Sequence, residues 1–204
     1  WYILQCEPDA CLYCGFCRDV TRQEVEEAIR QNTILALLNR VPIHPGEAYF
    51  IPAGTVHAIG KGCLICEIQQ SSVCTYRLYD YNRTDKYGNY RELHLQRALE
   101  VMDYSEYRVQ RFESETIERK AYTLRILGRC KYFECTSCRL RGTYPLETDG
   151  NSFWSVLCVR GDGKMHCPES GEELALRAGE SLFIPAGERR LLLEGEGEFI
   201  LTHI

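Results

Sequence analysis

The nine-residue stretch GEAYFIPAG at residues 46–54 returns as GESLFIPAG at residues 179–187, with seven of nine positions identical. In each copy a Gly-Glu pair suits a turn, an apolar run suits a short strand, and Pro-Ala-Gly suits a second tight turn. Short strands separated by Gly- and Pro-rich turns are typical of β-sandwiches and jelly rolls. The repeat therefore predicts a mainly β protein built from two copies of one β-unit.

A weaker echo extends this repeat. WYIL at residues 1–4 is similar to WSVL at residues 154–157, and an Asp follows eight residues after each Trp. We therefore expect a first unit over residues 1–80, a linker over residues 81–120 and a second unit over residues 121–204. Because the chain opens with Trp1 on what reads as a strand already in progress, we also expect it to lack an N-terminal part.

Two helices are expected among the strands. Thr21 and Glu24 form a capping-box pattern in front of Val25, which predicts a helix over about residues 21–31 inserted in the first unit. A mixed apolar face predicts a second helix over about residues 92–102, inside the linker.

Size and composition limit the possible classes of protein. The chain has 204 residues, of which 45% are hydrophobic, so it can form one large domain or two small ones. No apolar run approaches the roughly 20 residues that span a bilayer, and no signal-peptide pattern opens the chain. The net charge of -5 comes from interspersed acids and bases, without the basic stripe that a nucleic acid requires. We expect a cytoplasmic protein with neither a membrane nor a nucleic-acid partner.

The chain contains twelve cysteines, some of them separated by two residues, which raises the question of a zinc cluster. Structural zinc sites usually place such pairs in knuckle-like turns, whereas Cys63 and Cys66 lie within an apolar strand pattern. The same spacing occurs at Cys11, Cys14 and Cys17 and at Cys135 and Cys138. Reduced and partly buried thiols in a cytosolic protein are the favoured interpretation.

One histidine follows the first copy of the repeat. In TVHAI at residues 55–59, strand alternation puts Thr55, His57 and Ile59 on one face. If that face lines the interior of the unit, the His57 imidazole suits a divalent metal such as zinc; the alternative is a hydrogen-bonded core histidine. The equivalent position of the second copy is Arg190, so only the first unit is expected to bind a metal.

The run EIQQSSVCTYRLYDYNR at residues 67–83 follows shortly after PAGTVHA at residues 52–58. Together with WYILQCEP at residues 1–8 and VPIHPG at residues 41–46, this combination closely resembles the short bacterial form of type I phosphomannose isomerases. The similarity extends over nearly the whole chain. It implies two cupin (jelly-roll) units, of which the second is non-catalytic, and the interconversion of mannose 6-phosphate and fructose 6-phosphate. The implied partner is therefore a small sugar phosphate.

The resemblance also implies roles for three residues. His57 matches a metal-ligating histidine, Arg77 matches a catalytic arginine, and Arg83 falls where related enzymes have a residue that contacts phosphate. The implied cofactor is Zn²⁺, although another divalent metal is possible. If residues 75–79 form a strand, Arg77 shares one of its faces with Thr75 and Tyr79 and can lie beside the metal.

Structural roles remain open for the same residues. Either arginine can be a surface charge or pair with Asp80 or Asp85. The family's other metal ligands, a Gln-x-His pair before a Pro and a Glu just before the first Trp strand, have no match here, and one ligand is too few for a tight zinc site. No residue is singled out as the general base.

Two other functions compete with isomerisation. The first is a non-catalytic, sugar-binding or regulatory cupin that keeps the barrel without turnover. The second is a metal cupin dioxygenase, which would need two histidines and a carboxylate near the first repeat. The surroundings of His57 contain no His-x-His pair, which argues against the dioxygenase.

Overall fold

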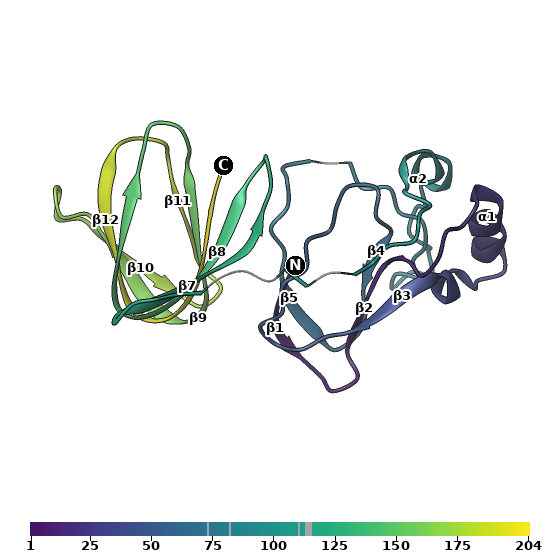
Figure 1. Cartoon of the computed structure of the whole chain (residues 1–204), viewed down its shortest axis with the longest axis horizontal. Helices are drawn as coiled ribbons and strands as arrows, with labels where there is room; N and C mark the ends of the chain where they lie inside the picture. The colour runs from purple at the N-terminus through teal and green to yellow at the C-terminus, as the bar shows by residue number, and fades with distance from the viewer. Residues whose placement is uncertain (73, 82, 110, 113–115) are drawn as a thin grey trace.

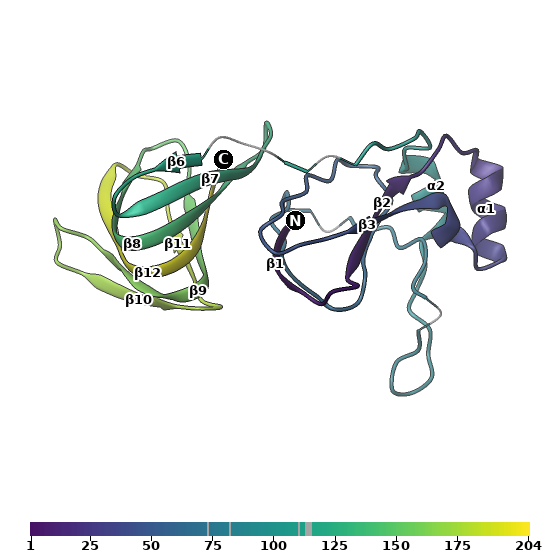
Figure 2. The ribbon, with the colours of Figure 1, turned by 60° about the horizontal axis from the view of Figure 1, so that its bottom comes forward.

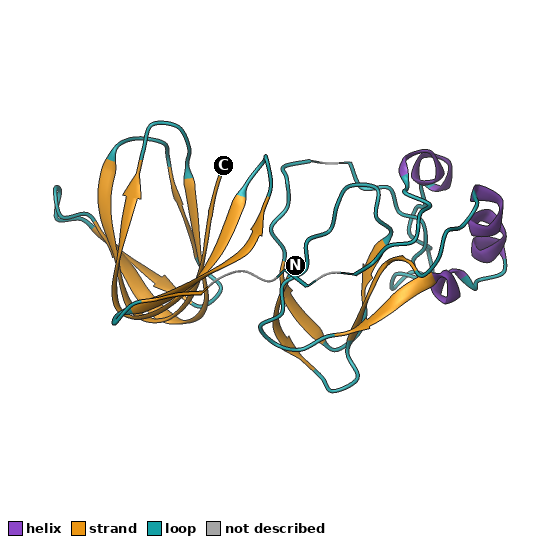
Figure 3. Ribbon diagram, viewed as in Figure 1, coloured by secondary structure: helices purple, strands orange, loops and turns teal. Residues whose placement is uncertain are grey.

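The protein consists of two β-rich lobes, which lie side by side with the helices at the far end of the N-terminal lobe (Figures 1 and 3). This computed structural model describes residues 1–72, 74–81, 83–109, 111–112 and 116–204. The predicted mainly β fold is confirmed. None of the helices described is long and apolar enough to cross a lipid bilayer.

The N-terminal lobe contains two small antiparallel sheets, with strand orders β1-β5 and β3-β2-β4. Buried apolar side chains fill the lobe, among them Ile3, Leu12 and Phe16. Its helices and strands, in chain order, are β1 (Tyr2–Cys6), β2 (Cys11–Phe16), α1 (Arg22–Arg30), the 3₁₀ helix η1 (Ile34–Leu37), β3 (Leu38–Pro42), β4 (His57–Ile59), β5 (Cys63–Cys66) and α2 (Leu95–Val101).

The C-terminal lobe is one antiparallel seven-stranded sheet that curls around its own apolar core (Figure 2). Its strand order is β10-β9-β12-β8-β7-β6, and β11 pairs with β9. Three strands of 13 to 15 residues carry the sheet, because β12 pairs with both β8 and β9 over most of its length. The strands are β6 (Thr116–Glu118), β7 (Tyr122–Arg129), β8 (Glu134–Thr148), β9 (Trp154–His166), β10 (Glu173–Arg177), β11 (Ser181–Ile184) and β12 (Arg189–His203).

Both predicted helices are present. Helix α1 begins after Thr21, whose hydroxyl accepts from the Glu24 amide while the Glu24 side chain accepts from the Thr21 amide, as the capping box predicts. Helix α2 is shorter than predicted and begins at Leu95. Buried Leu99 packs in the same apolar cluster as Val25 of α1, so α2 belongs to the N-terminal lobe although it lies in the predicted linker. The division of the chain at residues 80 and 120 remains a prediction.

The repeated Gly-Glu pair makes the same turn in both lobes. Gly46 and Gly179 have φ angles of +88° and +89°, a conformation that glycine adopts without steric cost. Each following glutamate fixes the turn with its own side chain: Glu47 accepts from the His44 amide at 2.9 Å, and Glu180 accepts from the Arg177 amide at 2.8 Å. The sequence repeat is therefore a structural repeat, since the Gly and the Glu have the same function in each copy.

The weaker sequence echo is out of register by two residues. The turn at Gly46 pairs with Ile3, which exchanges backbone hydrogen bonds of 2.8 and 2.9 Å with Gly46 and Glu47. The turn at Gly179 pairs in the same way with Cys158, at 2.8 and 3.0 Å. Ile3 thus corresponds to Cys158, whereas aligning the two Trp residues equates it with Val156. A shift of two residues keeps every side chain on the same face of the strand, which is why the hydrophobic pattern did not reveal it.

A buried carboxylate joins the two lobes. Glu198 of β12 is 7% exposed, and its Oε1 accepts hydrogen bonds from the Tyr2 hydroxyl at 2.5 Å and the Ser137 hydroxyl at 2.8 Å. Burial and the hydrogen bond to Glu198 raise the pKa of the Tyr2 phenol, which keeps it a donor. Arg125 of β7 lies over the Tyr2 ring and donates to the Gly46 carbonyl of the N-terminal lobe at 2.5 Å. The interface is therefore hydrogen-bonded as well as apolar.

We predict that Tyr2→Phe lowers the free energy of unfolding by about 1.5–3 kcal/mol, the usual contribution of a hydrogen bond to a charged group. The ring and its packing remain, so the loss reports the hydrogen bond alone. Urea denaturation followed by circular dichroism measures it. Tyr90→Phe, at a tyrosine that is 71% exposed, is the matched control and should change the free energy of unfolding by less than about 0.5 kcal/mol. Equal stability of the two variants would contradict the prediction.

Candidate functional site

A cavity of about 1070 Å³ lies in the N-terminal lobe and reaches the β7–β8 turn of the other lobe. We call it the central cavity. It is lined by His57 of β4 and by Arg77, the two residues that the sequence predicts to share a site. The other polar side chains of the lining include those of Glu67, Gln69, Gln70, Thr75, Tyr76, Lys131 and Tyr132. The volume is sufficient for a small organic ligand.

The His57 imidazole is oriented by its own backbone. Its Nδ1 lies 2.7 Å from the Thr55 carbonyl oxygen, and because a carbonyl only accepts, Nδ1 carries the hydrogen. Nε2 is therefore the nitrogen with a free lone pair, as in metal-binding histidines whose other nitrogen donates to a carbonyl. The Trp1 ring meets the imidazole edge to face, with centroids 5.2 Å apart, while its Nε1 donates to Glu67 at 2.9 Å.

Arg77 lies on an irregular segment, so the expectation of a strand over residues 75–79 is wrong for the residues that the structure describes. The Arg77 amide donates to Nδ1 of His94 at 3.2 Å, and the His94 amide donates to the Arg77 carbonyl at 2.8 Å. The His94 imidazole and amide thus form the two hydrogen bonds that a neighbouring strand would make with the Arg77 backbone. Arg77 is half-buried, and its guanidinium donates through Nη1 to the Glu92 carbonyl at 3.2 Å. Among the described residues its other guanidinium nitrogens have no acceptor, so they are available to a ligand.

Sequence reasoning did not identify His94. It lies immediately before α2 and holds the Arg77 backbone from both sides, yet no motif marks it. The Tyr76 ring contacts it at a centroid distance of 6.3 Å. His94 is a positioning residue for the Arg77 segment.

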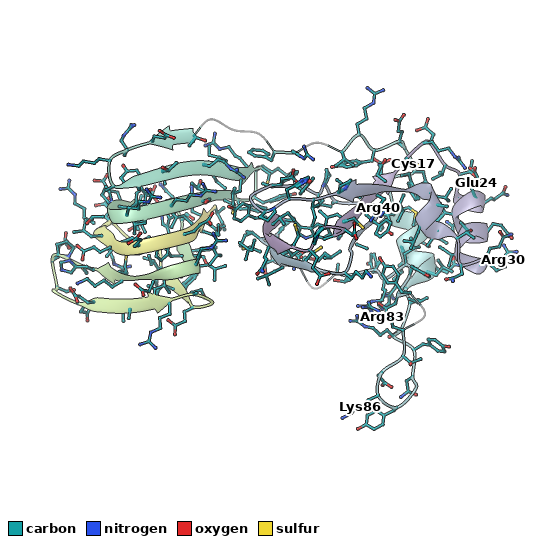
Figure 4. All side chains as sticks on the ribbon, turned by 90° about the horizontal axis from the view of Figure 1, so that it is seen from below. Cys17, Glu24, Arg30, Arg40, Arg83 and Lys86 are labelled. Carbon is teal, nitrogen blue, oxygen red and sulfur yellow. The ribbon has the colours of Figure 1, made fainter. Side chains whose placement is uncertain are left out.

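Arg83 lies elsewhere. Its Nη2 is 2.5 Å from Asp80 Oδ1, and its guanidinium lies 5.5 Å from the centroid of the Tyr81 ring. Of the two carboxylates considered from sequence, Asp80 therefore pairs with Arg83, whereas Asp85 accepts from the Tyr87 and Asn89 amides. Figure 4 shows Arg83 at the base of the loop that carries Lys86 at its tip. Arg83 is not among the described residues that line the central cavity.

The described residues do not by themselves form a tight metal site. Among them, no group of three His, Cys, Asp or Glu side chains is arranged to hold an ion. His57 has a suitable free nitrogen, but a structural zinc needs four ligands and a catalytic zinc usually three from the protein. All twelve cysteines are free thiols.

The second unit has an arginine, Arg190, at the position of the repeat that His57 occupies in the first unit. Arg190, the counterpart of His57, points to Glu147 across the sheet, with 3.9 Å between their charged groups, and both side chains are largely exposed. The interior of this lobe is filled by a cluster of apolar side chains that includes Leu140, Val156 and Phe199. These side chains form a packed apolar core.

Comparisons with known proteins agree with this architecture. Residues 123–204 match the family model described as "Mannose-6-phosphate isomerase, cupin domain". The chain is 36% identical over 206 residues to the mannose-6-phosphate isomerase ManA of Bacillus subtilis, covering 100% of this chain and 63% of that protein. It is 32% identical to the putative mannose-6-phosphate isomerase YvyI of the same organism, over 87% of this chain and 57% of that protein. The crystal structure of the mannose 6-phosphate isomerase from Bacillus subtilis superposes with a TM-score of 0.88 at 29% identity, covering 100% of this chain and 63% of that one.

The repeated turn, the two β lobes and these matches define a protein of the cupin class. Within that class it is a mannose-6-phosphate isomerase-like protein, as the sequence motifs predicted. The chain spans 63% of the length of ManA.

We predict that His94→Ala loosens the segment that carries Arg77. The Arg77 amide loses its acceptor, a loss of about 0.5–1.5 kcal/mol, so local hydrogen exchange should become about 3- to 10-fold faster. Exchange of peptides that cover residues 74–81, followed by mass spectrometry, measures this. Peptides from β12 serve as the internal reference, and His166→Ala in the other lobe is the matched control. Unchanged exchange around Arg77 in His94→Ala would remove His94 from its positioning role.

Proposed function

We propose that this protein interconverts mannose 6-phosphate and fructose 6-phosphate by aldose-ketose isomerisation, in the cytoplasm. The observation that carries the proposal is that His57 and Arg77 line one cavity although they are 20 residues apart on different segments. Support comes from the similarity to ManA, whose name describes this activity, along the whole of the present chain.

The reaction requires stabilisation of negative charge. A proton leaves the carbon beside a carbonyl and returns to the neighbouring carbon through an enediol, so the sugar oxygens carry negative charge in between. A guanidinium suits this task because its planar set of N–H donors binds two oxygens at once. Arg77 is half-buried in the cavity wall and anchored at one end by the Glu92 carbonyl, so its remaining N–H groups are held in place for such an oxygen. We assign it to intermediate stabilisation or proton handling.

We further propose a divalent metal, Zn²⁺ before others, with His57 as one of its ligands. The support is the fixed orientation of the His57 ring, with Nε2 available, and the similarity of the chain to mannose-6-phosphate isomerases, a family in which the sequence resemblance implies a metal. The described residues supply too few further ligands, so no step of the reaction is assigned to the ion.

Arg83 is proposed as a contact of the substrate phosphate. In the structure its guanidinium is held by Asp80, which is 8% exposed and also lies 3.7 Å from Arg91. To reach a phosphate in the central cavity, Arg83 has to leave this pair. The proposal therefore requires a rearrangement of the segment between Asp80 and Arg91 when the sugar phosphate binds.

The second candidate function is a sugar-binding cupin without turnover. The observation that favours it is the incomplete metal-ligand set of the described residues. The two functions differ in one respect that is easily measured, since both bind a sugar phosphate but only the isomerase converts it.

We predict that Arg77→Ala lowers kcat/KM for mannose 6-phosphate by at least about 100-fold, the usual effect of removing one donor to a developing oxyanion. A coupled assay for fructose 6-phosphate measures it, on the 204-residue chain and in parallel on the full product of its reading frame. Arg30→Ala, at an exposed arginine of α1, is the matched control. Unchanged turnover in a folded Arg77→Ala variant removes Arg77 from the mechanism. If the unmutated protein binds mannose 6-phosphate but does not convert it, in the 204-residue chain and in the full product of the reading frame alike, the sugar-binding cupin without turnover is favoured.

We also predict that His57→Ala lowers the amount of zinc bound per chain, because His57 lines the cavity and its Nε2 is not used by the contact with Thr55. Elemental analysis after dialysis against trace zinc, again on both forms of the protein, measures this. His44→Ala is the matched control, since that imidazole is largely exposed and lies near Glu47. If zinc content is the same in both variants, the His57 ring has no metal role and is held by the Thr55 carbonyl.

A further inference from the structure

We propose that Cys6 and Cys63 form a site of reversible oxidation, in which a disulfide oxidant such as oxidised glutathione joins them across strands β1 and β5. The two residues are direct partners in the antiparallel register, and both are free thiols in the structure. The proposal concerns a site other than the central cavity and does not depend on the isomerase function.

The hydrogen-bond pattern places this pair in the position that brings side chains closest. The Glu7 amide donates to the Gly62 carbonyl at 2.8 Å, so residues 7 and 62 face each other in a hydrogen-bonded position. The neighbouring pair, Cys6 and Cys63, therefore occupies a non-hydrogen-bonded position, where Cα atoms are typically about 4.5 Å apart. Disulfides accept Cα distances of about 4.4–6.8 Å, so the bond requires little movement of the backbone.

The side chains of the two cysteines share one environment. Residues directly opposite each other in a sheet project from the same face, and both thiols pack at the edge of the apolar cluster that contains Ile43. The Cys6 thiol donates to the Ile43 carbonyl at 3.4 Å, and the Cys63 thiol approaches the Cys11 carbonyl at 3.8 Å. Both cysteines are half-buried, so a small oxidant has access to them.

Other cysteines among the described residues do not combine a cysteine partner in the strand register with partial exposure to solvent. Cys138 and Cys158 are fully buried in the apolar core of the C-terminal lobe, where no solute reaches them. Cys74 is exposed and lies outside every strand, so no register holds a second thiol opposite it. Cys11 is the competing partner for Cys63, but it is buried and lies on β2, which belongs to the other small sheet.

The reaction is a thiol-disulfide exchange in two steps. The thiolate of one cysteine attacks a sulfur of oxidised glutathione, forms a mixed disulfide and releases one glutathione thiolate, which takes up a proton. The second cysteine then attacks the protein sulfur of the mixed disulfide and releases the second glutathione. Two protein thiols lose two electrons and two protons, and glutathione disulfide gains them as two thiols. Because burial, followed by the charges of Cys11 and Cys6, raises the pKa of Cys63, exchange should be faster at mildly alkaline pH.

The bond would close a long loop around the functional part of the N-terminal lobe. Residues 7–62 include β2, α1, β3 and β4 with His57, and β5 leads directly into Glu67. Trp1, just before β1, donates to Glu67 and contacts His57. The disulfide would therefore hold together the two strands that flank one wall of the central cavity, and it would stabilise the folded chain by restricting the unfolded one.

The experiment uses the purified protein, oxidised glutathione at pH 8 and an acid quench, followed by alkylation and mass spectrometry. We expect a loss of about 2 Da, alkylation of ten of the twelve cysteines, and a crosslinked peptide pair that contains Cys6 and Cys63. The oxidised protein should melt about 5–10 °C higher, and dithiothreitol should reverse both changes.

Two variants and one control complete the test. Cys6→Ser and Cys63→Ser should each abolish the crosslink and the rise in melting temperature, whereas Cys74→Ser should retain both. The crosslinked peptides of the unmutated protein decide the outcome even if a variant folds poorly. A bond between Cys11 and Cys63, stable mixed disulfides with glutathione on both cysteines, or no change in mass would each overturn the proposal.

Discussion

A glutamate carboxylate that accepts a backbone amide three residues earlier fixes the turn on which both lobes depend. Glu47 and Glu180 make this contact in the two copies, each behind a glycine with a positive φ angle. The turn sets where the following apolar residues return to the preceding strand, at Ile3 in one lobe and Cys158 in the other. Everything that follows the turn, including His57, is positioned relative to that strand. An alanine in place of either glutamate would leave a turn amide without its partner.

Local rules let the sequence predict those parts of the fold that depend on few residues. The capping box at Thr21 and the repeated turns depend on two or three neighbouring residues and one type of contact, and both were predicted correctly. The register of the Trp echo was wrong because a shift of two residues leaves the alternation of faces unchanged. Periodicity alone does not distinguish the two registers.

The candidate site was predictable only in part, for a related reason. The motif comparison singled out His57 and Arg77, and the structure places both in the wall of the central cavity. Strand alternation was the wrong argument for Arg77, because its backbone pairs with the imidazole and amide of His94. A contact between a side chain and a backbone 17 residues away leaves no periodic signal in the sequence. Arg83 illustrates the same limit, since its pairing with Asp80 was one of several arrangements that the sequence allowed.

The twelve cysteines differ in their chemistry, because the environment of each thiol decides its reactivity. Burial raises the pKa of Cys138 to about 12 and that of Cys135 to about 11, so these thiols stay protonated and act as small apolar side chains. Cys6 and Cys63 lie half-buried at the edge of a small two-stranded sheet, where register places them together and an oxidant has access. The two copies of the repeat also differ at the position that His57 and Arg190 share. At this position the second lobe forms an exposed ion pair, whereas His57 of the first lobe lines the central cavity. A duplicated unit can divide its roles in this way without any change in the turn that both copies share.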